Sequence, residues 1–161
     1  MAILVTGGAG FIGTHTCIEL INAGYEPIVV DNYYNASPKA LERVEEIVGK
    51  KVKFYECDVR DKKKLDSVFK ENKIDAVIHF AGLKAVEYYD NNIGGTLALC
   101  EVMRDNGCKK IVFSSSATVY GMNNVSPLTE DMKTGGTTNP YGTTKYMIEI
   151  ILEDLYKADN S

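Results

Sequence analysis

The chain has 161 residues, 45% of them hydrophobic and 25% charged, which is ordinary for a soluble globular protein and enough for one sizeable core. Its formal net charge of −4 argues against nucleic acid or an acidic membrane surface as the main partner. No apolar run approaches the roughly 20 residues of a membrane helix. The chain also enters a strand pattern at once, so we expect no signal peptide and a cytoplasmic location.

Cysteine and histidine usage gives no indication of a metal centre. The four cysteines form no C-x-x-C pair and no metal-ligand spacing, so we expect buried, reduced thiols; they are Cys17, Cys57, Cys100 and Cys108. The two histidines, His15 and His79, fall in a helical and a strand pattern, and we interpret both as structural. The sequence therefore predicts no metal site.

Short strand-like apolar runs alternate along the chain with longer helical patterns. The predicted strands are Ala2–Thr6, Pro27–Asp31, Val52–Cys57, Ala76–Phe80 and Lys110–Ser114. The predicted helices are Ile12–Asn22, Pro38–Val48, Lys62–Glu71, Tyr88–Arg104 and Tyr141–Lys157. This alternation favours an α/β fold with right-handed crossovers, that is, a doubly wound, Rossmann-like parallel sheet of about five strands with flanking helices. We expect residues 1–161 to form one domain.

The first strand pattern, Ile3–Val5, runs directly into clustered glycines. Gly8, Gly10 and Gly13 match G-x-G-x-x-G, and Gly7 can replace Gly8 in a wider form of the motif. Such a turn brings the main chain close to a pyrophosphate and directs the N–H groups of the following helix at it. Because glycine-rich turns also occur for structural reasons, the motif needs support from an acidic residue further along.

Two aspartates end predicted strands. Asp31 follows Gly13 by eighteen residues, the offset at which a carboxylate accepts hydrogen bonds from the adenosine ribose. A carboxylate there would repel the extra phosphate of NADP, which favours NAD; the alternative is a turn residue that caps the strand end. Asp58 ends the third strand, where the sheet edge would meet an adenine, although aspartate is also common in turns.

Near the end of the chain, Tyr141 and Lys145 stand four residues apart at the start of a helical pattern. Residues at this spacing share a helix face, and a neighbouring cation lowers the pKa of a tyrosine. Such a tyrosine can remove a proton from an alcohol. The same spacing is also common in amphipathic surface helices. The long irregular segment before it, Gly121–Asn139, is typical of a lid or binding loop.

In order along the chain, these features resemble the UDP-glucose 4-epimerase family (also called UDP-galactose 4-epimerases), a group of extended short-chain dehydrogenases/reductases. The runs that carry the resemblance, besides the glycine turn and Asp31, are His79–Val86, Tyr88–Asn92, Phe113–Gly121 and Asn139–Gly142. Two of them, His79–Val86 and Phe113–Gly121, are specific to that family within the superfamily. The resemblance covers essentially the whole chain.

The resemblance implies an NAD-dependent isomerase of galactose metabolism that interconverts UDP-galactose and UDP-glucose. Tyr141 would remove the proton from the sugar 4-hydroxyl while NAD takes the hydride from C4 and later returns it to the other face. Ser116 would hydrogen-bond the same oxygen, and Lys145 would hold the nicotinamide ribose and lower the pKa of Tyr141. The family homodimer implies contacts through the helices Tyr88–Arg104 and Tyr141–Lys157.

The resemblance also implies a set of cofactor-binding positions around NAD. Besides Ser116, Tyr141 and Lys145, they are Gly7, Gly10, Phe11, Ile12, Gly13, Asp31, Asn32, Asn35, Asp58, Val59, Phe80, Ala81, Gly82, Lys84 and Asn91.

Two departures from the family pattern affect the expected activity. The family has a further segment between the positions of Val86 and Glu87, which are adjacent here. The sequence also stops at Ser161, where the family is about half finished, so we expect the substrate-binding domain to be absent. Because sugar placement contributes several kcal/mol to lowering the barrier, activity would be reduced or lost.

Three alternatives remain. The chain could be a non-catalytic or engineered minimal NAD-binding module. It could be a nucleotide-sugar dehydratase, although those enzymes carry an acid soon after the serine or threonine, and here Ala117-Thr118 follows Ser116. A flavin-binding α/β domain would leave Asp31 and the Tyr141–Lys145 pair unexplained.

Overall fold

The computed structural model describes residues 1–84, 88–122 and 124–159, which form two compact units. The first comprises Met1–Ala81 and Gly95–Ser114, and the second comprises Gly82–Gly94 and Ser115–Ser161. The junction of Val86 and Glu87, where the family has a further segment, lies outside the described residues.

The first unit contains one parallel sheet with strand order β3-β2-β1-β4-β5. The strands are β1 (Ala2–Thr6), β2 (Glu26–Asp31), β3 (Lys53–Glu56), β4 (Ala76–His79) and β5 (Ile111–Phe113). The chain winds outwards from β1 in one direction to β3 and then in the other through β4 to β5, which is the doubly wound topology. The predicted fold class is therefore confirmed, with strand ends shifted by at most one residue.

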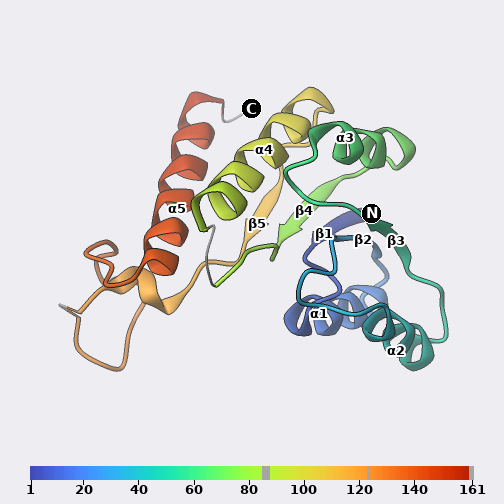
Figure 1. Cartoon of the computed structure of the whole chain (residues 1–161), viewed down its shortest axis with the longest axis horizontal. Helices are drawn as coiled ribbons and strands as arrows, with labels where there is room; N and C mark the ends of the chain where they lie inside the picture. Colours follow the sequence, from blue (N-terminus) through green and yellow to red (C-terminus); the bar gives the residue numbers. More distant parts are fainter. Residues whose placement is uncertain (85–87, 123, 160–161) are drawn as a thin grey trace. The chain divides into compact units, whose positions relative to one another are not determined.

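Helices cover both sides of this sheet (Figure 1): α1 (Phe11–Asn22) and α2 (Pro38–Val48) lie on one side, and α3 (Lys62–Glu71) and α4 (Gly95–Asp105) on the other. Two of them begin at side-chain caps. The Ser37 side chain accepts a hydrogen bond from the Lys39 amide, and the Asp61 side chain accepts one from the Lys64 amide. The helix starts at α2 and α3 are thus set by local sequence.

Each face of the sheet has its own hydrophobic cluster. Leu4, Ile28 and Val77 point to the side covered by α3 and α4, where they pack with Leu65 and Leu99. The neighbouring strand residues Ile3, Val5 and Val29 point to the other side and pack against α1 and α2. Strand residues alternate between the two clusters, so the strands are apolar on both faces, as a covered parallel sheet requires.

The second unit consists of a π-helical turn, η1 (Tyr89–Gly94), a 3₁₀ turn, η2 (Ala117–Tyr120), and the long helix α5 (Pro140–Ala158). The predicted helix over Tyr88–Arg104 is helical in the structure, but its first turns are π-helical through η1 before the α-helix α4 begins at Gly95. Asparagine and glycine are poor formers of helix interiors, and η1 is rich in both.

The predicted irregular segment is confirmed: in the described part of Gly121–Asn139 the chain forms neither helix nor strand. The four cysteines are free thiols, and Cys17, Cys57 and Cys108 are buried. Burial raises the pKa of Cys17 to about 12, so this thiol stays protonated and unreactive at neutral pH.

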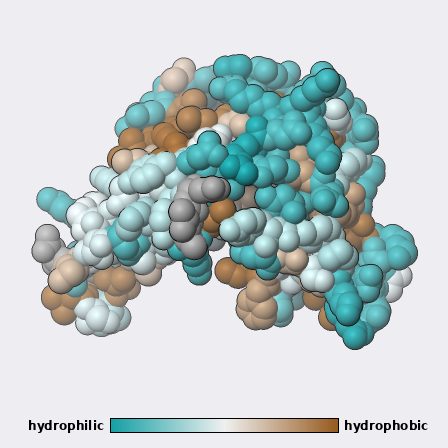
Figure 2. All heavy atoms as spheres, viewed as in Figure 1, coloured by the Kyte–Doolittle hydropathy of each residue, from teal (hydrophilic) through white to brown (hydrophobic). Residues whose placement is uncertain are grey.

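Charged side chains of α2 and α3 face outwards. Figure 2 shows a largely hydrophilic surface where these two helices lie in Figure 1. Among the residues that the structure describes, no helix has the length and apolar character needed to cross a membrane.

Candidate functional site

The glycine turn joins β1 to α1 by a close approach of main chain to main chain. Gly7 has a φ of +68°, and a Cβ atom at this position would lie 2.7 Å from the amide nitrogen of Ala81. A Cβ atom on Gly13 would lie 2.5 Å from the carbonyl oxygen of Gly7. Both distances are too short for any side chain, so the turn depends on glycine at these two positions.

The N-terminus of α1 is suited to an anion. Its N-cap is Gly10, which provides no side-chain cap, and the first residues, Phe11 and Ile12, are 82% and 59% exposed. The first N–H groups of an α-helix have no partner within the helix. Together with the positive end of the helix dipole they can bind a phosphate, as the sequence motif predicted.

Asp31 lies at the end of β2 and links the glycine turn to the next loop. Its side chain is 8% exposed; Oδ2 accepts a hydrogen bond from the Ala9 amide at 3.1 Å and Oδ1 accepts one from the Tyr33 amide at 2.9 Å. A carboxylate has about four acceptor positions, so two amide donors leave room for two hydroxyl groups. The two interpretations of Asp31 are therefore compatible, since it caps the turn and can also accept from a ribose.

Asp58 lies just after β3, next to Asn32. Its carboxylate accepts hydrogen bonds from Arg60 at 2.8 to 2.9 Å, through the backbone amide, Nε and Nη2, and from Asn32 Nδ2 at 3.0 Å. The side-chain bond from Arg60 is the main reason that the pKa of Asp58 is lowered to about 2. This carboxylate is ionised at every physiological pH and presents only acceptors.

The remaining predicted positions of the first unit follow β2, β3 and β4. Phe80 and Ala81 follow β4, and their amides donate to the Thr6 carbonyl at 3.0 Å and to Thr6 Oγ1 at 3.4 Å. Val59 is buried next to Asp58, and Asn35 is exposed in the loop between β2 and α2. Apart from Asn35, these positions gather where β1 to β4 end, which is the edge at which doubly wound folds bind ligands.

In the second unit, Tyr141 and Lys145 lie on the first turns of α5. This helix begins at Pro140, and the Asn139 side chain caps it by accepting from the Gly142 amide at 2.7 Å. Lys145 Nζ lies 5.7 Å from the centroid of the Tyr141 ring, and Lys84 Nζ lies 5.8 Å from it. The structure therefore brings two lysines, rather than the one predicted on the helix face, to the same tyrosine.

Burial governs both pKa values at this pair. Lys145 is 3% exposed, and burial, with the nearby charge of Lys84, lowers its pKa to about 8. The pKa of Tyr141 is raised, because burial disfavours the phenolate. The predicted lowering of the Tyr141 pKa by Lys145 is thus wrong for this structure, because burial of the phenol is what shifts this pKa.

Ser116 is the N-cap of η2, and its Oγ accepts hydrogen bonds from the backbone amide of Thr118 at 3.2 Å and from Thr118 Oγ1 at 2.9 Å. Two donors to this oxygen leave the Ser116 hydroxyl hydrogen to be donated elsewhere. Thr118 also packs closely on α5, because a Cβ atom on Gly142 would lie 2.9 Å from its Oγ1. Thr118 thus connects Ser116 to the turn of α5 that carries Tyr141.

Asn92 was not among the predicted site residues, yet it connects three parts of the second unit. Its buried amide accepts from the Leu83 amide at 2.8 Å and donates to the Leu83 carbonyl at 3.0 Å and to Thr144 Oγ1 at 3.1 Å. It thereby holds the segment with the predicted positions Gly82 and Lys84 against the helix that carries Lys145. A polar pair, Asn91-Asn92, inside a helical pattern was the one available signal, since asparagine rarely stabilises a helix interior.

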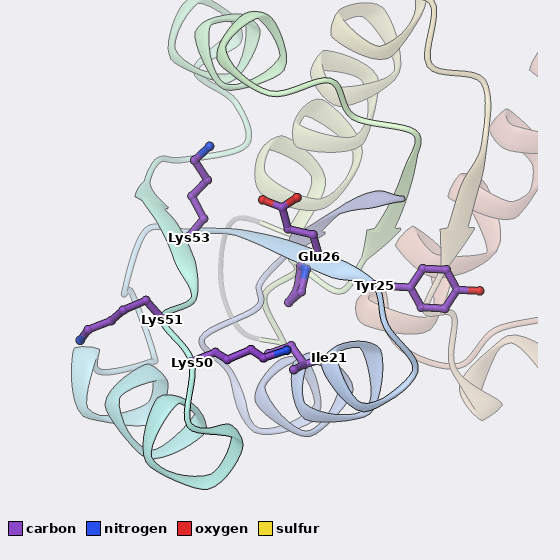
Figure 3. Close-up of a pocket in the computed structure, with 7 residues that line it drawn as sticks. Ile21, Tyr25, Glu26, Lys50, Lys51 and Lys53 are labelled. Carbon is purple, nitrogen blue, oxygen red and sulfur yellow. The ribbon is translucent and has the colours of Figure 1, made fainter.

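A surface pocket of about 240 Å³ lies at the opposite, amino-terminal ends of β2 and β3, where Ile21, Tyr25, Glu26, Pro27, Lys50, Lys51 and Lys53 line it. Figure 3 shows that its three lysines point in different directions. Lys51 is paired with Glu45 at 2.6 Å. The pocket therefore offers no converging charges. The residues that the structure describes also contain no group of histidine, cysteine or acidic side chains that could hold a metal ion.

The parallel sheet, the glycine turn and the acid at the end of β2 define a dinucleotide-binding protein of the Rossmann type. Within that class, the chain belongs to the NAD dependent epimerase/dehydratase family, which matches residues 3–161.

The relatives that share about 60% of their residues with the matched region are UDP-glucose 4-epimerases. The enzyme of Bacillus subtilis is 61% identical over 168 residues, which covers 99% of this chain and 49% of the relative. The crystal structure of the Bifidobacterium longum enzyme in complex with NAD+ and UDP is 60% identical, has a TM-score of 0.96, and is matched over 99% of this chain and 50% of its own. This chain therefore spans about half the length of the relatives that it matches.

A related dehydratase is more distant. The structure of dTDP-glucose 4,6-dehydratase from Bacillus anthracis in complex with NAD is 27% identical, with a TM-score of 0.87 over 99% of this chain and 52% of its own. The fold is thus shared across reaction types, and the higher identity lies with the epimerases.

Proposed function

We propose that this chain is the NAD-binding portion of a UDP-glucose/UDP-galactose 4-epimerase and that its 161 residues form one NAD-binding domain. The observation that carries the proposal is the pair of half-buried Tyr141 and buried Lys145, in a chain 61% identical to such an epimerase. A module that only bound NAD would need neither a buried lysine with a lowered pKa nor a tyrosine beside it.

NAD fits the residues of the first unit. The N-terminus of α1 binds the diphosphate, with Gly7, Gly10, Phe11, Ile12 and Gly13 supplying close main chain. Asp31 accepts from the adenosine ribose. Asp58, whose acceptor positions are taken by Arg60 and Asn32, borders the adenine together with Asn32 and Val59, and Asn35 lies in the loop between β2 and α2 on the same side of the cofactor. Phe80 and Ala81 border the same strand ends. Because Asp31 and Asp58 are carboxylates, we expect NAD to be preferred over NADP.

The second unit supplies the proton chemistry, with Gly82, Lys84 and Asn91 near the nicotinamide. NAD, when bound, takes a hydride from C4 of the sugar and returns it to the opposite face. Tyr141 removes the proton of the 4-hydroxyl, and Ser116 donates its hydroxyl hydrogen to the same oxygen. Since burial raises the pKa of Tyr141, its phenolate needs the positive charges of Lys145 and Lys84.

The substrate and the activity of this chain are the parts of the proposal that depend most on its length. The relatives are about twice as long as the matched region. We expect UDP-galactose and UDP-glucose to need residues beyond these 161 for correct placement, which makes turnover by this chain weak or absent. The half-length match also favours a second candidate, a non-catalytic, engineered or minimal, NAD-binding module.

We further propose a cytoplasmic homodimer with contacts through the Tyr88–Arg104 and Tyr141–Lys157 segments. Large apolar side chains are exposed on both, namely Leu97 on α4 and Met147, Ile150 and Leu155 on α5. Light scattering coupled to gel filtration should give a dimer mass, and replacement of Leu97 and Ile150 by serine should give a monomer. A monomeric mass for the unaltered chain would refute this part.

The first experiment measures thermal unfolding against increasing NAD, with NADP in parallel, after any NAD already bound has been removed. NAD at one hundred times its dissociation constant should add about 2.7 kcal/mol, and NADP much less. An assay of UDP-galactose conversion then separates the two candidates, because only an epimerase produces UDP-glucose. Absence of any shift with NAD would refute both.

A further inference from the structure

A histidine buried in the sheet lies outside the proposed binding and catalytic residues. His79, the last residue of β4, is 1% exposed, and both of its ring nitrogens have partners. Nδ1 lies 2.6 Å from Thr6 Oγ1 at the end of β1, and Nε2 lies 3.0 Å from Thr96 Oγ1 at the start of α4. Both threonines are fully buried. The ring thus bridges three elements of the first unit.

The partners of Thr6 determine the direction of these hydrogen bonds. The backbone amide of Ala81 can only donate, so Thr6 Oγ1 accepts from it at 3.4 Å. The Thr6 hydroxyl hydrogen then goes to the other partner of this oxygen, His79 Nδ1. A neutral imidazole that accepts at Nδ1 carries its hydrogen on Nε2 and donates it to Thr96. The neutral tautomer with hydrogen on Nε2 therefore satisfies the whole chain of contacts.

The two threonines that contact His79 lie in different surroundings. Thr6 immediately precedes Gly7, and the Ala81 amide is the group that a Cβ atom on Gly7 would meet at 2.7 Å. The bond between Thr6 and Ala81 therefore lies next to the close approach of Gly7 to the segment after β4. Thr96 instead lies on α4, beside Gly95, where an added Cβ atom would meet the side chain of Val59 at 2.7 Å. The Thr6 side faces the glycine turn, whereas the Thr96 side joins the ring to α4.

We propose that His79 is a positioning residue for NAD. By accepting the Thr6 hydroxyl hydrogen, it turns the Thr6 oxygen towards the Ala81 amide and so sets the spacing between the glycine turn and the segment after β4. The Thr96 contact contributes stability only. The inference rests on the proposed function, since it assumes that this turn binds the diphosphate of NAD.

Two substitutions of the same shape test the asymmetry. Thr6→Val and Thr96→Val each remove one buried hydroxyl that contacts a ring nitrogen of His79. We expect both to lower the free energy of unfolding by similar amounts. Only Thr6→Val should weaken NAD binding, by about tenfold in calorimetric titration, as expected for one hydrogen bond lost from an ordered turn. Thr6→Ser, which keeps the hydroxyl, should restore the affinity.

Substitutions of the histidine itself provide the second test. The side-chain amide of asparagine can take the place of Nδ1, and that of glutamine the place of Nε2. His79→Asn should therefore keep the contact with Thr6 and bind NAD nearly as the unaltered chain does, while His79→Gln should bind more weakly. In the unaltered chain, ¹⁵N spectra of His79 should show hydrogen on Nε2 and none on Nδ1, whether or not NAD is present.

The possible outcomes distinguish a failure of the proposed function from a failure of the inference about His79. Absence of NAD binding by the unaltered chain overturns the proposed function and this inference together. If the unaltered chain binds NAD but Thr6→Val and Thr96→Val bind it equally well, only the inference is overturned. The same holds if the spectra show hydrogen on Nδ1. If Thr6→Val does not fold, the comparison of His79→Asn with His79→Gln decides.

Discussion

The two units affect the ionisation of their side chains in opposite ways. In the first unit, Asp58 lies at the end of a strand, and hydrogen bonds from Arg60 and Asn32 favour its charged form and lower its pKa to about 2. In the second, burial and the like charge of Lys84 disfavour the charged form of Lys145 and lower its pKa to about 8. Burial likewise raises the pKa of Tyr141.

This difference agrees with the proposed roles of the two units, cofactor binding in the first and proton transfer in the second. A group that recognises a cofactor works best with a fixed charge and a fixed set of acceptors, as at Asp58. A group that exchanges a proton works best when its charged and neutral forms are close in free energy at the working pH. Lys145, with a pKa of about 8, is close to that condition, whereas burial moves Tyr141 away from it. Four substitutions test this contrast.

The largest expected effect is on proton transfer in the second unit. Tyr141→Phe keeps the ring but removes the hydroxyl, so any conversion of UDP-galactose should fall by about a thousandfold. NAD affinity should stay within about twofold, because a single peripheral contact is lost. In an alkaline titration by tyrosinate absorbance, the variant should lack one phenol that ionises late, since the pKa of Tyr141 is raised.

The matched control is Tyr156→Phe, which alters an exposed tyrosine near the other end of the same helix. It should leave conversion unchanged. Conversion retained in Tyr141→Phe would show that another group acts as the base.

The next effect is on the glycine turn of the first unit. In Gly13→Ala the new Cβ atom would lie 2.5 Å from the Gly7 oxygen and 2.6 Å from the Gly8 Cα atom, and backbone atoms cannot move aside. We expect a loss of about 3 kcal/mol in the free energy of unfolding, measured with urea. Gly94→Ala is the control, because its Cβ atom would meet only the Asp90 carboxylate at 3.6 Å. Equal stabilities of the two variants would mean that the turn is not tightly packed.

The carboxylate at the end of β2 should account for cofactor choice. Asp31→Ala removes two ribose acceptors and the contact with the Ala9 amide, so NAD should bind about thirtyfold more weakly. NADP should lose much less, because the repulsion of its extra phosphate disappears. Calorimetric titration of both cofactors measures the ratio. Asp105→Ala, on the exposed end of α4, should leave both affinities as they are, and unchanged NAD affinity in Asp31→Ala would remove this residue from the site.

The smallest effect concerns the two lysines. Because burial is the larger cause of the lowered pKa of Lys145, Lys84→Met should raise that pKa from about 8 only part of the way to 10.5. NMR of ¹³C-methylated lysines measures it directly, with Lys133→Met as the control. A pKa unchanged by Lys84→Met would show that Lys84 does not act on Lys145.

The same pair makes a prediction about pH and stability. Because the pKa of Lys145 in the folded chain, about 8, is below its ordinary 10.5, the unfolded chain binds more protons between these values. The contribution of Lys145 to stability should therefore rise with pH across this window and stay constant below it. Lys84→Met should raise the lower pH limit of this window, because it raises the pKa of Lys145 in the folded chain.

Local sequence was sufficient for most of the fold. The alternation of apolar runs predicted five strands and their helices in the right order, because both faces of each strand must be buried in a covered parallel sheet. The glycines and Asp31 identified the turn that links β1, α1 and β2, because these residues directly follow or end predicted strands and can be recognised from local sequence. The site residues themselves remain proposals, to be tested by the substitutions above.

Other features depended on contacts between distant residues, which no local pattern contains. The link between Thr6, His79 and Thr96 joins three elements across 90 residues, and Asn92 meets Leu83 and Thr144 only in the folded chain. The direction of the Tyr141 pKa shift likewise depends on how deeply the phenol is buried. Thus the sequence by itself determined the order of strands and helices and the chemical groups at the edge of the sheet. Burial and long-range hydrogen bonds, which exist only in the tertiary structure, decided how those groups are held and charged.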